Sequence, residues 1–218
     1  MRTIKKVASH IFIDGFGGMT QGLFATLIIG TMIQQIGLLI GGSTGNVIYL
    51  LGKAAAALTS AGIGVGVAVK YGESPLVTVS AAVAAMVGGY AGKITGGTFF
   101  VDGNAVLAGP GEPLGAFIAA FAGITCGHLV SGKTKVDIIV TPVITIGAGS
   151  VVGLLVGPPI SQMMTGLGSI INWATEQRPF IMGIVVSVVM GMVLTLPISS
   201  AALGIILNLS GLAAGAAT

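Results

Sequence analysis

Charged residues are scarce in this chain, which has nine Lys and Arg and six Asp and Glu among its 218 residues. They make up 7% of the sequence, whereas soluble domains contain roughly 25%. Long uncharged intervals separate them: 38 residues follow Asp14, 38 follow Asp137, and the last 40 begin at Pro179. So few charges cannot coat a water-soluble globule, and a helix crosses a bilayer with about 20 apolar residues. We therefore expect an all-α, polytopic protein that contacts the lipid bilayer.

Other residue types that are rare or dispersed exclude several kinds of function. One cysteine, Cys126, cannot form an internal disulfide framework or a Cys-rich metal site. The two histidines, His10 and His128, are far apart, and no paired carboxylates occur at helical spacing. We therefore expect no metal, no cofactor and no catalytic residues. The net charge of +3 is scattered rather than gathered in a stripe, so nucleic acid is not an expected partner.

Glycine, in contrast, is abundant, with 37 residues that fall largely inside apolar runs. Spacings such as Gly62 to Gly66 and Gly88 to Gly92 follow the small-xxx-small pattern. Small residues allow membrane helices to approach closely. Lipid also simply tolerates glycine, but the recurring spacing favours a tightly packed bundle.

Five membrane crossings are predicted before residue 157. Their bounds are Leu23–Ile40, Val47–Val69, Leu76–Gly92, Leu114–Val130 and Ile138–Val156. With a cytoplasmic N-terminus, six basic residues lie on the cytoplasmic side and three on the other, as the positive-inside rule requires. The six are Arg2, Lys5, Lys6, Lys70, Lys133 and Lys135, and the three are Lys53, Lys93 and Arg178. Together with the C-terminal stretch, the pattern predicts about six to seven transmembrane helices.

The C-terminal third is expected to hold two less regular elements. After Pro158 and Pro159, apolar residues recur at helical spacing opposite a polar face, which predicts an interfacial amphipathic helix ending before Pro179. A connector is the favoured role for it over a substrate gate. The remaining 40 residues exceed one crossing, so the chain must turn near Pro197. A plain hairpin and a re-entrant hairpin both fit this turn.

Two motifs have more than one interpretation. The segment from Gly127 to Thr134 satisfies the phosphate-binding P-loop pattern, but it follows an apolar span instead of a short strand, so we interpret it as a turn after the fourth crossing. Glu112 lies in a turn between Pro110 and Pro113. It either begins the following helix, where a carboxylate favours the positive dipole end, or contacts a ligand, and the first role is favoured.

Four segments resemble a known family. They are Gly-Glu-Pro-Leu-Gly-Ala-Phe, Val-Ser-Gly-Lys-Thr-Lys-Val-Asp-Ile-Ile-Val-Thr-Pro, Ile-Asn-Trp-Ala-Thr-Glu and Leu-Thr-Leu-Pro-Ile-Ser-Ser-Ala-Ala. They are similar to the IIC sugar permeases of the phosphotransferase system, in particular the branch that includes PfoR-like toxin regulators. The resemblance implies a homodimer in the bacterial cell membrane with a solute site near re-entrant hairpins. Family members continue beyond a final Ala-Gly-Ala-Ala-Thr string. We therefore expect a single transmembrane domain that belongs to a longer protein.

The resemblance also sets the expected function. It implies a permease domain that binds and translocates a small polar solute, a sugar, and works with soluble IIA and IIB phosphate carriers. The alternative is a membrane sensor or regulator without transport. Since Cys126 lies in an apolar span, phosphorylation would have to come from a separate protein. Buried or turn-forming polar residues are the candidate solute contacts: Glu112, His128, Ser199, Ser200 and Asn208.

Overall fold

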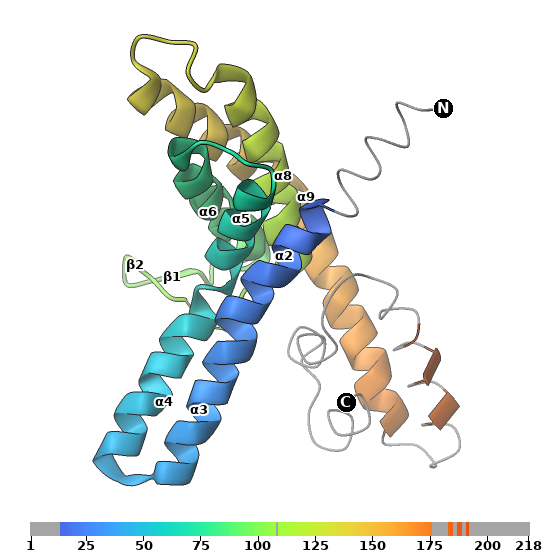
Figure 1. The fold of residues 1–218 in the computed structure, drawn as a ribbon. Coiled ribbons are helices and arrows are strands. Elements are labelled where there is room, and N and C mark those ends of the chain that lie inside the picture. Colours follow the sequence, from blue (N-terminus) through green and yellow to red (C-terminus); the bar gives the residue numbers. More distant parts are fainter. Residues whose placement is uncertain (1–13, 108, 176–182, 185–186, 189–190, 192–218) are drawn as a thin grey trace. The chain divides into compact units, whose positions relative to one another are not determined.

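The computed structural model describes residues 14–107, 109–175, 183–184, 187–188 and 191. These residues are almost entirely helical, with one two-stranded hairpin (Figure 1). The all-α expectation is confirmed. The chain forms two compact units, Met1–Pro158 and Pro159–Thr218, and the candidate sites below belong to the first.

The helices and strands follow one another along the chain with short connections. They are α2 Phe16–Leu23, the π-helical turn η2 Phe24–Ile28, α3 Ile29–Ile40, α4 Gly42–Ala57, α5 Thr59–Lys70, α6 Pro75–Gly89, α7 Ala91–Thr95, β1 Phe100–Val101, β2 Asn104–Ala105, α8 Pro113–Val130 and α9 Asp137–Thr175. The antiparallel strands β1 and β2 pair Phe100 with Ala105 and form a small exposed hairpin between α7 and α8. The predicted first and fourth crossings therefore end at the predicted residues, Ile40 and Val130.

Three helical stretches in the described part of the chain are long and apolar enough to cross a membrane: Phe16–Ile40, Pro113–Val130 and Asp137–Leu167. The pair α4 and α5 makes a fourth if its two helices count as one span, and α6 is a shorter apolar helix. A multi-pass membrane protein is confirmed. The total of six to seven helices stays a prediction.

The second predicted crossing is not one helix. It divides into α4 and α5, which meet at an angle of 53°. At the break, Leu58 has φ −86° and ψ 10°, its N–H bonds to the Ala55 carbonyl, and the Thr59 hydroxyl donates to the Ala56 carbonyl at 2.6 Å. A threonine hydroxyl that takes a backbone acceptor favours a helix end. No proline marks this break, and the sequence therefore predicted a continuous span.

The separation of the fifth crossing from the amphipathic segment is also wrong. Helix α9 runs without interruption from Asp137 to Thr175, through Pro158 and Pro159. Proline has a φ that suits a helix, and its cost lies in the missing N–H. The amphipathic segment is helical as predicted, but it continues the crossing helix. The turn predicted near Pro197 lies outside the described residues.

Glycine brings the helices into backbone contact, as its spacing predicted. A Cβ placed on Gly18 would lie 2.6 Å from the Gly66 carbonyl oxygen, and one on Gly22 would overlap the Gly62 backbone. Helices α6 and α8 meet in the same way at Gly88 and Gly115. Since these neighbours are backbone atoms, they cannot rotate away. Close packing of the helices therefore depends on these positions.

Replacing a contact glycine should destabilise the protein. We expect Gly22→Ala to cost about 1–3 kcal/mol, because the added methyl collides with the α5 backbone. Gly17→Ala is the matched control on the same helix, where the nearest atom is the Lys70 Cε at 3.8 Å. The measurement is the thermal unfolding midpoint in detergent. Equal midpoints for the two variants would contradict the packing described here.

Candidate functional site

A tight turn from Gly109 to Pro113 leads into α8. Gly109 and Gly111 adopt positive φ angles of 80° and 76°, a conformation that glycine adopts readily. Pro113 occupies the first helical position, where its missing N–H costs nothing. The local sequence thus fixes both the turn and the point at which α8 begins, and it places Glu112 immediately before the helix.

Glu112 caps α8. Its carboxylate accepts from the N–H groups of Leu114 at 3.2 Å and Gly115 at 2.6 Å, which satisfies two otherwise free donors at the helix end. Burial raises the pKa of the Glu112 carboxyl, and the two backbone hydrogen bonds act in the opposite direction. The predicted role at the helix start is confirmed. Each carboxylate oxygen still has a lone pair for a further donor.

Hydrogen bonds from two other helix ends hold the Gly109–Pro113 turn. The Glu112 N–H donates to the Gly89 carbonyl at 2.7 Å, and the Ser60 hydroxyl donates to the Pro110 carbonyl at 3.0 Å. The Tyr90 hydroxyl contacts the Gly109 carbonyl and lies 3.3 Å from the Ala57 carbonyl. These bonds join the turn to the ends of α4 and α6 and to the start of α5.

Three helix interruptions in the described part of this unit consequently lie together. The break at Leu58 ends α4, Tyr90 separates α6 from α7 with φ −103° and ψ 9°, and the Gly109–Pro113 turn precedes α8. In a membrane protein, irregular backbone persists where other protein groups satisfy it or where it lines a cavity. Interrupted helices whose ends converge are also where transporters bind solutes. The sequence did not identify Ser60 or Tyr90, because neither lies in a recognisable motif.

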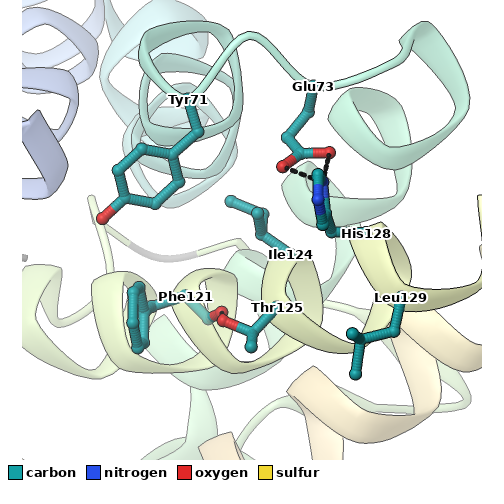
Figure 2. A pocket seen from close by; sticks show the side chains of 7 residues that line it. All are labelled: Tyr71, Glu73, Phe121, Ile124, Thr125, His128 and Leu129. Carbon is teal, nitrogen blue, oxygen red and sulfur yellow. Dashed lines mark hydrogen bonds and ion pairs between the residues drawn. The ribbon is translucent and has the colours of Figure 1, made fainter. Parts of the chain in front are cut away.

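A second polar cluster lies at the other end of α8. Nδ1 of His128 is 3.0 Å and 3.2 Å from the two oxygens of Glu73, which lies in the α5–α6 turn (Figure 2). The imidazole is 71% exposed, whereas the carboxylate side chain is only 9% exposed. The pair borders a pocket of about 390 Å³ that is lined by Tyr71, Glu73, Phe121, Ile124, Thr125, His128 and Leu129.

The α5–α6 turn carries the partners of this cluster. Tyr71 packs edge-on against Phe121 with ring centroids 6.2 Å apart. Burial, with a contribution from the nearby Asp14 carboxylate, raises the pKa of Tyr71 to about 12, so its hydroxyl is neutral. The hydroxyls of Ser74 and Ser131 lie 3.0 Å apart and join this turn to the end of α8. Glu73 was not among the predicted site residues.

The structure separates the two predicted site residues that it describes. Glu112 and His128 lie at opposite ends of α8, 16 residues apart in sequence, which is about 24 Å along a helix. One small solute cannot touch both in this arrangement. Ser199, Ser200 and Asn208 lie outside the described residues.

The P-loop pattern is part of a helix end. Its first residues, Gly127 to Val130, finish α8. The Lys133 ammonium donates to the Leu129 carbonyl at 2.7 Å, and the Gly132 N–H donates to the Asp137 carboxylate at 2.9 Å. The preceding element is a helix rather than a strand, so the context of a phosphate loop is absent here. In the described ranges, no three metal-binding side chains gather.

Comparison with known proteins identifies the family. A family profile described as "Phosphotransferase system, EIIC" matches residues 13–218. The chain belongs to this family. No curated protein and no solved structure matches it. Together with the apolar helices, the match makes the chain a multi-pass membrane permease domain of the phosphotransferase system.

The two polar clusters should differ in their contribution to stability. We expect Glu112→Ala to cost about 1–2 kcal/mol, because two N–H groups at the start of α8 lose their acceptor. His128→Ala should cost less than about 1 kcal/mol, since the imidazole is exposed and water can replace it beside Glu73. Chemical unfolding in detergent measures both. A larger loss for His128→Ala would contradict the assigned roles.

Proposed function

We propose that this EIIC domain binds a sugar beside Glu112 and translocates it across the bacterial cell membrane. The supporting observation is the convergence of the three helix interruptions on the Glu112 turn. The Glu112 oxygens offer two free lone-pair positions to hydroxyl donors. The buried hydroxyls of Ser60 and Tyr90 hold the turn that positions Glu112. A phosphorylated solute is disfavoured at this position by the Glu112 carboxylate.

The proposal includes soluble IIA and IIB phosphate carriers. The single cysteine, Cys126, lies within the apolar helix α8. A separate protein would therefore deliver the phosphate to the sugar after binding. We further propose that residues 1–218 act as one transmembrane domain, as a homodimer with a cytoplasmic N-terminus. Ser199, Ser200 and Asn208 remain proposed contacts.

Solute uptake tests this function directly. The full chain is reconstituted in proteoliposomes, with and without IIA and IIB proteins, and a panel of radiolabelled mono- and disaccharides is offered. We expect uptake or binding of at least one sugar, and a loss of at least about tenfold in its affinity for Glu112→Gln, because the charge that receives the hydroxyls is removed.

His128→Gln is the matched control, since it changes a polar residue at the far end of the same helix. It should leave affinity for the sugar unchanged. The absence of both uptake and binding across the whole panel of sugars would refute the proposal. Binding without uptake in the presence of both carriers, together with altered transcription when the gene is deleted, would instead support the sensor alternative.

A further inference from the structure

Glycine contacts join the antiparallel helical stretches on both sides of the break at Leu58. Gly18 faces Gly66 and Gly22 faces Gly62. Farther along, Gly30 lies against Gly52 and Ala56, and Gly37 lies against Gly45 and Tyr49.

Between these two sets of contacts, both stretches are irregular: η2 is a π-helical turn, and Leu58 is the break between α4 and α5, which meet at 53°. Thr26 of η2 packs against Gly62, just beyond the break. The two irregularities therefore form one joint that crosses both helices.

Beyond this joint, α3 and α4 form a separate arm. They lie side by side and extend away from α5, α6 and α8 (Figure 1). In the described part of the first unit, they pack mainly on each other and on η2. Their outward side chains are largely apolar and exposed, as with Leu39, Leu50 and Leu51, which suits lipid contact. Rigid helices that pack on each other and join the rest at element ends are typical of hinged motion.

One side chain connects the end of this arm to the Glu112 turn. The Tyr90 hydroxyl contacts the carbonyl of Ala57, the last residue of α4, and the carbonyl of Gly109. The ring is only 1% exposed and packs against Phe99, so the hydroxyl has a fixed position. The Ala57 carbonyl lies at the break, immediately before Leu58. A swing of the arm would change the distance between the Ala57 carbonyl and the Glu112 turn.

We infer that α3 and α4 swing as one arm on the joint formed by η2 and Leu58, and that Tyr90 ties this arm to the Glu112 turn. The motion follows from the packing and stands whether or not the bound solute is a sugar. If the proposed function is correct, the arm regulates access to its site. Tyr90 is then a positioning residue for Glu112.

Distances between spin labels test the arm. In the Cys126→Ser chain, reconstituted in lipid nanodiscs, one nitroxide pair on Leu39→Cys and Val79→Cys crosses the joint, because Leu39 lies near the tip of the arm and Val79 lies on α6. A second nitroxide pair, on Val79→Cys and Thr95→Cys, does not cross the joint, because Val79 lies on α6 and Thr95 lies on the next helix, α7. All three positions are exposed. We expect the first distance distribution to be about twice as broad as the second, as for hinged elements.

Tyr90→Phe tests the link, because it removes only the hydroxyl. It should shift or broaden the Leu39–Val79 distribution and leave the Val79–Thr95 distribution unchanged. Hydrogen exchange should quicken at the Glu112 amide, whose bond to Gly89 depends on the position of the turn. Tyr49→Phe, on the arm itself and away from the joint, is the matched control and should change neither readout.

Two results would overturn the inference. A Leu39–Val79 distribution as narrow as the Val79–Thr95 one, in both the parent and Tyr90→Phe, means that the arm is fixed. A broad distribution that Tyr90→Phe leaves unchanged, with unchanged exchange at Glu112, means that the arm moves without a link to the turn. Loss of sugar uptake bears on the proposed function alone, because neither readout requires a solute.

Discussion

Lipid offers no hydrogen-bond partners, and this constraint organises the described unit. Every interruption of a helix leaves backbone groups that the protein itself must satisfy. The breaks at Leu58 and Tyr90 and the turn before α8 meet this requirement by lying together, where a serine hydroxyl, a tyrosine hydroxyl and the Gly89 carbonyl serve the exposed groups. Three costly irregularities are stabilised at one place, and the same place contains a partly buried carboxylate.

Glycine makes this arrangement possible. Backbone groups of different helices can serve one another only when their axes approach closely, and side chains larger than hydrogen prevent that approach. The contact between Gly88 and Gly115 brings the end of α6 beside the start of α8, so that Gly89 reaches the amide of Glu112. The contacts of α2 with α5 and of α3 with α4 set the register on the two sides of the joint. The abundance of glycine therefore underlies both the close packing of the helices and the position of the polar site.

The sequence predicted those features that rest on local patterns. Apolar length located α8 within one residue, and the Pro-Gly-Glu-Pro string located the cap at Glu112. It could not predict the break at Leu58, because the helix is interrupted there by tertiary contacts and a threonine hydroxyl rather than by proline. It placed a helix boundary at Pro158, where proline alone was insufficient to end α9. Glu73 and His128 come together through the packing of α6 on α8, which no spacing within the sequence reveals.

We propose that the permease meets its solute at the Glu112 turn and not at the His128 end of α8. Accessibility of substituted cysteines tests it most directly, in the Cys126→Ser chain with a water-soluble thiol reagent. Pro110→Cys is the probe in the turn, and Thr134→Cys is the probe beyond the far end of α8. If the solute binds at the Glu112 turn, the sugar taken up by the protein slows modification at Pro110→Cys and leaves modification at Thr134→Cys unchanged. Protection at Thr134→Cys alone, under conditions that saturate uptake, would contradict it.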